Sequence, residues 1–266
     1  MTMTNFLTPS TIPGVSALLG SPQDDNIALF TGQISVPRDG ILLLSGNDNL
    51  QTSNLNDNLL INGNQGNDTL VASNGSDTVF GGQDNDRIFA AVNSDLIFGN
   101  FGDDVLEGGF NTDAIYGGQG NDTLYGDEEN DLLFGDLGND IVDGDAGIDT
   151  LIGGFGNDSF IFDTGEASFT VRDVDEIRQF EPGTSSFNGD KIVVPVGTQI
   201  DPNSLFRDRF DLLPQENDLN GDGLNDIIVE LLDGRILGAV INDGFLPAQL
   251  TFDLDFVFSN AFDFNL

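Results

Sequence analysis

The feature that most constrains the fold of this chain is a nine-residue repeat. Starting at Gly63, the pattern GNQGNDTLV recurs every nine residues as far as the segment SFI at 159–161. The eighth position of every repeat is apolar, and the sixth is always aspartate. These aspartates are Asp68, Asp77, Asp86, Asp95, Asp104, Asp113, Asp122, Asp131, Asp140, Asp149 and Asp158. So regular a period indicates a stack of equivalent structural units.

The composition of the repeat predicts its local structure. Positions one to six are rich in glycine and asparagine, which tolerate the left-handed backbone of a tight turn, and positions seven to nine form a short strand. Two repeats then make a coil of eighteen residues, with the eighth-position side chains pointing inward as a narrow core. We therefore predict an all-β fold of stacked coils. A solvated low-complexity linker is the alternative, but a linker would not keep an apolar residue at every eighth position.

Two of the repeats resemble a known family. The segments GGQGNDTLY at 117–125 and GGFGNDSFI at 153–161 are similar to the GGxGxDxUx nonapeptide of repeats-in-toxin (RTX) proteins. The resemblance covers about a hundred residues directly. It implies a right-handed parallel β-roll with Ca²⁺ in its turns, each ion held by the sixth-position aspartates of two turns one coil apart and by turn carbonyls. The first such pairs would be Asp68 with Asp86 and Asp77 with Asp95.

The charge of the chain also indicates calcium. With 8 basic and 45 acidic residues, the net charge of −37 argues against a nucleic-acid partner. Cysteine and histidine are absent from the sequence, which excludes disulfides, the usual zinc ligand sets and histidine acid–base chemistry. Residues 63–161 contain 17 Asp, 3 Glu and 1 Arg, a net charge of −19, and nine aspartate pairs with one ion each would add +18. We expect this region to fold only with calcium.

The two edges of the predicted roll differ. Odd-numbered repeats follow the family pattern closely, with Asn67, Asn85, Asp103, Asn121, Asn139 and Asn157 before the aspartate. Even-numbered repeats depart from it and place Glu129 where a left-handed glycine is expected. Our hypothesis is that the odd edge carries the tight calcium ladder and that the even edge binds calcium more weakly or with gaps.

The outward positions of the even strands form an apolar ladder. They are Thr78, Phe80, Leu96, Phe98, Ala114, Tyr116, Leu132, Phe134, Thr150 and Ile152. Because a bare apolar sheet face is unfavourable in water, we expect a cover. The flanking regions of the chain, a neighbouring subunit, or a polysaccharide stacked on the aromatic rings are the three candidates.

The flanks are predicted to close the roll. We expect an N-terminal cap of strands at 1–45, the roll at 46–162 and a C-terminal β-rich capping domain at 163–266. The stretches VDEIRQFEPG at 174–183 and GDKIVV at 189–194 are similar to the segment that caps the roll in secreted RTX enzymes.

A second calcium signal lies in the C-terminal region. The ligand pattern D-x-N-x-D-G-x-x-D is formed by Asp218, Asn220, Asp222 and Asp226. Its alternate oxygen ligands resemble the calcium loops of integrin propellers and EF-hands, but Val229 stands where an EF-hand needs glutamate. We predict a β-hairpin calcium loop, with an acidic turn without metal as the alternative.

The ends of the chain bear on its location. The N-terminal sequence lacks the charged and apolar regions of a signal peptide, and no segment has the length and apolarity of a membrane span. The C-terminal sequence TFDLDFVFSNAFDFNL resembles the uncleaved signals of type I secretion substrates. An ordinary edge strand, which would have a similar pattern of residues, is the alternative. We therefore expect an extracellular or cell-surface protein that leaves the cell unfolded.

Three classes of function fit these patterns. The first is a structural protein, a layer, sheath or filament subunit that self-assembles once calcium folds it. The second is a calcium-dependent polysaccharide or adhesion module. The third is an enzyme, which we do not expect, because the H-E-x-x-H and G-x-S-x-G-plus-histidine sites of related enzymes need histidine. A histidine-free glycosidase would use two carboxylates, and no acidic pair stands out.

Overall fold

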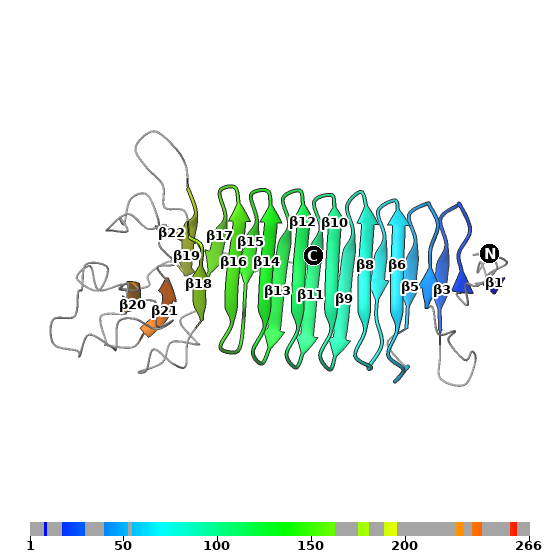
Figure 1. The fold of residues 1–266 in the computed structure, drawn as a ribbon, viewed down its shortest axis with the longest axis horizontal. Helices are drawn as coiled ribbons and strands as arrows, with labels where there is room; N and C mark the ends of the chain where they lie inside the picture. Colours follow the sequence, from blue (N-terminus) through cyan, green and yellow to red (C-terminus); the bar gives the residue numbers. More distant parts are fainter. Residues whose placement is uncertain are drawn as a thin grey trace.

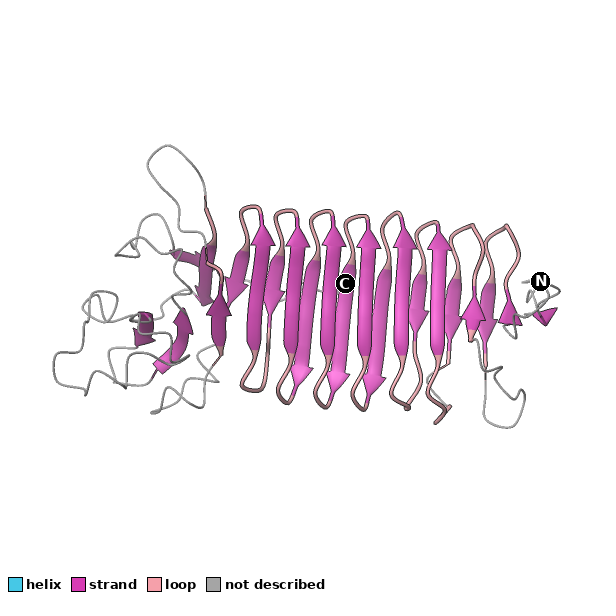
Figure 2. Ribbon diagram, viewed as in Figure 1, coloured by secondary structure: helices cyan, strands magenta, loops and turns pink. Residues whose placement is uncertain are grey.

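The computed structural model describes residues 8–9, 18–29, 40–52, 55–162, 175–180, 189–195, 227–230, 236–240 and 256–259. Within these ranges the chain consists of strands joined by turns, without helices (Figure 2). It follows that no helix in the described part of the chain could span a membrane. The predicted all-β parallel roll is confirmed.

Strands alternate along the chain between two sheets, which lie face to face along the whole roll (Figure 1). The first, here called the even sheet, has the order β1 (Thr8–Pro9), β2 (Leu18–Leu19), β4 (Ile41–Leu42), β6 (Leu60–Gln65), β8 (Thr78–Gln83), β10 (Leu96–Phe101), β12 (Ala114–Gln119), β14 (Leu132–Leu137), β16 (Thr150–Phe155), β18 (Glu176–Arg178), β21 (Ile236–Val240), β20 (Ile227–Glu230). The second, the odd sheet, has the order β22 (Phe256–Ser259), β19 (Lys191–Pro195), β17 (Ser159–Ile161), β15 (Ile141–Asp143), β13 (Thr123–Glu128), β11 (Val105–Phe110), β9 (Arg87–Val92), β7 (Thr69–Val71), β5 (Asn49–Gln51), β3 (Asn26–Ala28).

The register of the sheets confirms the eighteen-residue coil. Ile97 on β10 lies opposite Ile115 on β12, and Leu106 on β11 lies opposite Leu124 on β13. All pairings between successive coils of the roll are parallel. The two antiparallel pairs of the described strands, β1 with β2 and β20 with β21, lie at the ends of the even sheet.

The core is a single column of side chains between the sheets. It contains the eighth-position residues Leu70, Val79, Ile88, Ile97, Leu106, Ile115, Leu124, Leu133, Val142, Leu151 and Phe160, all of which are fully buried. The eighth-position residues of successive coils lie opposite one another and belong to one buried cluster, so no single coil has a core of its own. Stacking is therefore the condition for burial, as in other solenoids.

Both sheets continue beyond the repeats. At the N-terminal end, β3 and β5 place Ile27 and Leu50 in the core column, in agreement with the strand-like runs expected there. At the C-terminal end, β18 and β19 pair with β16 and β17 and bury Ile177 and Ile192. The boundaries at residues 45 and 162 stay predictions, because both sheets run across them.

Two adjacent leucines on β14 allow a test of whether the eighth-position side chains form the core. Leu133 is fully buried and points inward, whereas Leu132 is half-buried and points outward. The Leu133→Ala change leaves a cavity, so we expect it to lower the free energy of unfolding in saturating calcium by about 2–5 kcal/mol. The matched Leu132→Ala change should cost clearly less. Urea unfolding followed by circular dichroism measures both, and equal losses would contradict an inward column.

Candidate functional site

The sixth-position aspartates form two ladders, one along each edge of the roll. We call the turns that lead from the even sheet into the odd sheet the odd edge, and those that lead back the even edge. Each aspartate is at most 4% exposed. On the odd edge, Oδ1 of Asp86 accepts a hydrogen bond from the backbone N–H of Asp68 at 2.8 Å, and Oδ1 of Asp104 accepts one from Asp86 at 2.7 Å. On the even edge, Oδ1 of Asp113 accepts one from Asp95 at 2.7 Å.

The second carboxylate oxygen is the unusual part of these ladders. In nine aspartates Oδ2 is buried and accepts no hydrogen bond from any described residue. They are Asp48, Asp68, Asp86, Asp95, Asp104, Asp113, Asp122, Asp131 and Asp140. A buried acceptor without a partner is costly, and a buried carboxylate oxygen is more costly still. A row of such atoms fits a bound cation.

The pKa values of the ladder aspartates reflect the same burial without compensating partners. Burial raises the pKa of Asp86 to about 8, against the lowering effect of the hydrogen bond from Asp68, while the Asp104 and Asp68 carboxylates raise it further. Burial likewise raises the pKa of Asp95 and Asp131 to about 8. Without a cation these carboxyls compete for protons near neutral pH, because their charge is left uncompensated.

The first position of the repeat makes room for this arrangement. A Cβ at Gly117 would lie 2.5 Å from Oδ2 of Asp122 and 2.7 Å from the carbonyl oxygen of Gly135, one coil further on. A carboxylate oxygen and a backbone carbonyl oxygen therefore converge above this glycine. The donor set is oxygen only, which suits calcium and not a soft metal.

The carboxylates do not gather in clusters. Among the described residues no three acidic side chains come together in a metal-binding group. A calcium ion in these turns would thus be held by ladder aspartates together with turn carbonyls, in agreement with the ligand set that the resemblance implies. The predicted loop with Asp218, Asn220, Asp222 and Asp226 lies outside the described residues, and its calcium site stays a prediction.

The two edges differ as the sequence suggests. On the odd edge, fifth-position side chains form a second ladder, in which Oδ1 of Asn121 accepts the N–H of Asn139 at 3.0 Å. On the even edge, Ala72 and Ala90 bring a methyl group to the first position, and Glu129 adopts a left-handed φ of 78°. The turns that begin at Ala72 and Ala90 therefore have less room for a carboxylate–calcium contact, whereas Gly108, Gly126 and Gly144 leave the same room as the glycines of the odd edge. The weaker calcium binding of the even edge stays a hypothesis.

Four ladder aspartates lie outside the nine-residue period, and the sequence analysis assigned none of them to a metal site. Asp48 and Asp25 extend the odd edge toward the N-terminus, and Asp190 extends it toward the C-terminus. Asp175 extends the even edge, where its Oδ1 accepts the N–H of Asp149. Insertions between coils hide them from a period search. The signal that finds them is an apolar residue two positions later, as in the D-x-U part of the motif.

The outer face of the even sheet carries an aromatic stack, as predicted. The rings of Phe80, Phe98, Tyr116 and Phe134 lie parallel, with centroids 4.9, 5.1 and 4.8 Å apart. All four side chains are half-buried. Because the ring faces cover one another, the stack presents ring edges rather than faces to its surroundings.

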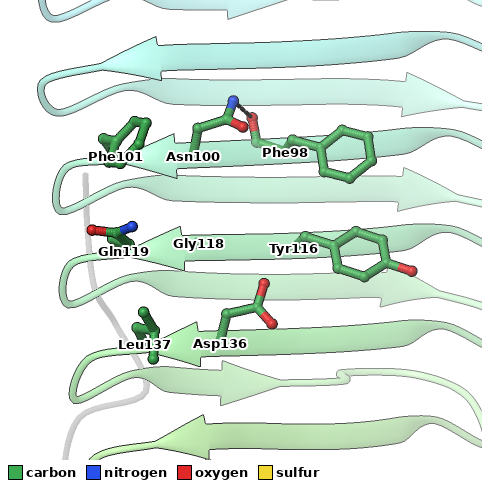
Figure 3. Close-up of a pocket in the computed structure, with 8 residues that line it drawn as sticks. All are labelled: Phe98, Asn100, Phe101, Tyr116, Gly118, Gln119, Asp136 and Leu137. Atoms are coloured by element: carbon green, nitrogen blue, oxygen red, sulfur yellow. Dashed lines mark hydrogen bonds between the residues drawn. The ribbon is translucent and has the colours of Figure 1, made fainter.

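A pocket of about 400 Å³ lies beside this stack, at the carboxyl ends of β10, β12 and β14. Figure 3 shows Phe98 and Tyr116 at one end and Phe101, Gln119 and Leu137 near the odd-edge turns. Its remaining lining residues are Asn100, Gly118 and Asp136. Phe101 and Leu137 are 51% and 45% exposed, so apolar surface continues from the stack onto the edge.

Comparison with known proteins supports the interpretation of the ladders. The family model of the RTX calcium-binding nonapeptide repeat matches the chain in four copies, at residues 62–97, 92–124, 116–151 and 134–166. The search of curated proteins found no match. The matched residues contain all eleven repeat aspartates, and repeats of this family bind multiple Ca²⁺ ions.

The raised pKa values predict how the calcium-free protein responds to pH. The pKa of Asp86 rises from its ordinary 3.8 to about 8 in the fold, so the folded state binds more protons than the unfolded state between these values. Stability from protonated ladder aspartates is present at low pH and is lost as pH rises through about 6 to 8. We expect metal-free protein to be more folded at about pH 5 than at about pH 8.

Circular dichroism of calcium-stripped protein checks this pH dependence. High salt in both samples screens the long-range repulsion between surface carboxylates, so the remaining difference reports on the buried ones. Equal folding at the two pH values would contradict the prediction.

A comparison of two aspartates tests whether the ladder position is the one that binds calcium. Asp122 is buried with an unpaired Oδ2, whereas Asp103 is exposed. We expect Asp122→Asn to reduce the number of calcium ions bound per chain by about one or two, because it removes a charged ligand shared between turns. Asp103→Asn should leave the number unchanged. Equilibrium dialysis with metal analysis measures the number of bound ions in both variants. A smaller loss for Asp122→Asn than for Asp103→Asn would contradict the assignment of Asp122 as a calcium ligand.

Proposed function

Because residues 62–166 belong to the family of RTX calcium-binding nonapeptide repeats, we propose that this chain is an extracellular structural protein that folds on calcium and then self-assembles. The layer, sheath or filament subunit is the form of this function that fits best. The observation that carries the proposal is the apolar face of the even sheet, which calcium-dependent stacking of coils would create.

Calcium and folding are coupled through the ladders. Successive coils bring buried carboxylates to a spacing of about 4.8 Å, the distance between paired strands. The repeat region has no counterbalancing positive side chains beyond Arg87, which is paired with Glu107 at 2.9 Å. Without cations the stacked carboxylates would repel one another, so assembly of the coils should wait for calcium.

This coupling supports an extracellular location. Free calcium is scarce in cytoplasm and abundant outside cells, so a chain of this kind would stay unfolded until it is exported. The resemblance of the C-terminal sequence to type I secretion signals favours the same route. Residues 251–255 and 260–266 of that sequence lie outside the described part of the chain.

Self-association is favoured by the extent of the apolar surface. The stacked rings on β8 to β14 continue into the exposed side chains of Phe101, Leu137 and Phe155, the last of which is 73% exposed. An apolar strip along one face and its adjoining edge is typical of a protein interface. A second copy of the chain offers a strip of the same length and spacing.

A polysaccharide module is the second candidate. The pocket favours it, because aromatic side chains there lie beside the polar groups of Asn100, Gln119 and Asp136, as in many ligand sites. The geometry of the stack argues against it. A sugar ring packs on the face of an aromatic ring, and the inner rings of this stack have their faces against each other.

We propose no catalytic role. The roll is a non-catalytic calcium-binding architecture, and the sequence contains no histidine or cysteine. The two-carboxylate alternative would require a pair of acidic groups flanking a sugar-sized cleft. The pocket beside the stack is lined by one carboxylate, Asp136.

Particle size tests the assembly. With calcium, we expect wild-type protein to form large particles by light scattering, and chelation should abolish both the particles and the β-structure seen by circular dichroism. A monomer under all conditions would contradict the proposal. Phe98→Thr and Phe134→Thr, on the even sheet, should keep the fold but reduce the particles, because they remove apolar contact area.

Phe89→Thr is the matched control for these variants. Phe89 is a phenylalanine at the equivalent strand position of the odd sheet and is 37% exposed. If its replacement reduced the particles as strongly as that of Phe98, the interface would not lie on the even sheet.

A further inference from the structure

Two of the ladder aspartates are satisfied without any metal. Oδ2 of Asp77 accepts hydrogen bonds from the backbone N–H of Ser73 at 2.7 Å and from its hydroxyl at 2.9 Å. Oδ2 of Asp25 accepts the N–H of Ser21 at 2.6 Å, and Oδ1 accepts its hydroxyl at 2.9 Å. In both turns the serine stands four residues before the aspartate. The serine thus supplies hydrogen bonds to the carboxylate that the repeat turns lack.

These serine-capped aspartates begin the two ladders. Asp25 is the first described rung of the odd edge, and its N–H donates to Asp48. Asp77 is the first rung of the even edge, where the preceding coil has Leu59 in the aspartate position. Each ladder therefore starts with a carboxylate that hydrogen bonds already satisfy.

Asp48 is a ladder aspartate that follows a capped one but has no serine cap of its own. It is 2% exposed, its Oδ1 accepts the N–H of Asp25 at 2.7 Å, and its own N–H donates to Asp68 at 2.8 Å. The residue four positions earlier is Leu44, so no serine hydroxyl is available. Its Oδ2 is buried and accepts no hydrogen bond from the described residues. The carboxylate has the ladder position but not the cap.

Leu44 resembles the two serines in its backbone conformation. Most repeat turns have a left-handed residue at this place, such as Gly82 or Asn100, with φ of 128° and 77°. Leu44, Ser21 and Ser73 are not among the described residues with positive φ. The turn before Asp48 therefore resembles a capped turn in which the capping side chain has been replaced by an apolar one.

Charge balance requires a partner for Asp48. Burial is the main effect that disfavours its ionised form, and the nearby carboxylates of Asp25 and Asp24 disfavour it further. The two ion pairs of the described residues, Arg87 with Glu107 and Arg178 with Glu176, lie on other coils. An unpaired, buried carboxylate next to other acidic groups calls for a cation with oxygen ligands.

We propose that Asp48 binds a calcium ion that takes the place of the missing serine cap. The metal ladder of the odd edge then begins one coil before residues 62–166, and the serine-capped Asp25 and Asp77 stand outside it. This inference uses the calcium binding of the repeat family and does not depend on self-assembly. It would remain valid for a monomer.

Three variants test the site. Asp48→Asn removes the charge while keeping the size of the side chain. Leu44→Ser installs the cap of Ser21 and Ser73 at a residue that is 38% exposed, so it leaves the core column intact. Asp77→Asn is the matched control, a buried ladder aspartate with a serine cap. Bound calcium per chain is measured by equilibrium dialysis with metal analysis, and circular dichroism in saturating calcium reports folding.

The count of bound calcium decides the outcome. We expect Asp48→Asn and Leu44→Ser to bind about one calcium ion fewer than wild type and Asp77→Asn to bind the same number as wild type. A wild-type count in folded Asp48→Asn overturns the proposal, as does an equal loss in Asp77→Asn. If Asp48→Asn does not fold, the count in Leu44→Ser decides by the same rule.

Discussion

The rest of this structure depends on one constraint, the burial of an aspartate carboxylate in every turn of the nine-residue repeats at the spacing of neighbouring strands. One oxygen of each carboxylate accepts a backbone N–H from the preceding coil, which holds successive turns in register. The other oxygen is left without a hydrogen bond in nine of these residues. The same group that aligns the coils therefore leaves a charge that only a cation or a proton can balance. On this account, calcium would be a component of the fold.

The carboxylate ladders and the apolar column act together. Each coil of the repeats contributes two eighth-position side chains to the core and buries them against its neighbours, so hydrophobic burial is gained when coils stack. Stacking also brings the carboxylates together, which opposes assembly until cations arrive. The outer face of the even sheet forms through the same event, because its aromatic rings come into contact only when their strands are in register. A surface for assembly would therefore be present only where calcium is.

Much of this arrangement follows from the sequence, because a period of nine with aspartate and an apolar residue two positions apart specifies both the turn and the inward face. The parallel roll and the core column are confirmed on that basis. What the period could not show lies where it is interrupted. Asp48 and Asp25 belong to the odd ladder although extra residues separate the coils, and Ser73 satisfies Asp77 although that aspartate has the same place in its repeat as the others. These distinctions depend on which oxygen contacts which group, and a one-dimensional pattern does not contain that information. The acidic loop at 218–226 lies outside the described residues and keeps the status of a prediction.

The central claim is that a calcium ion completes the buried carboxylates of the ladder. Anomalous scattering from calcium in crystals grown with the metal tests it most directly, because it locates each ion relative to each aspartate. The account predicts a row of peaks along the odd edge, each about 2.3–2.6 Å from an Oδ2 atom of the ladder. Turns without peaks, in which water molecules hydrogen-bond to the Oδ2 atoms, would contradict it.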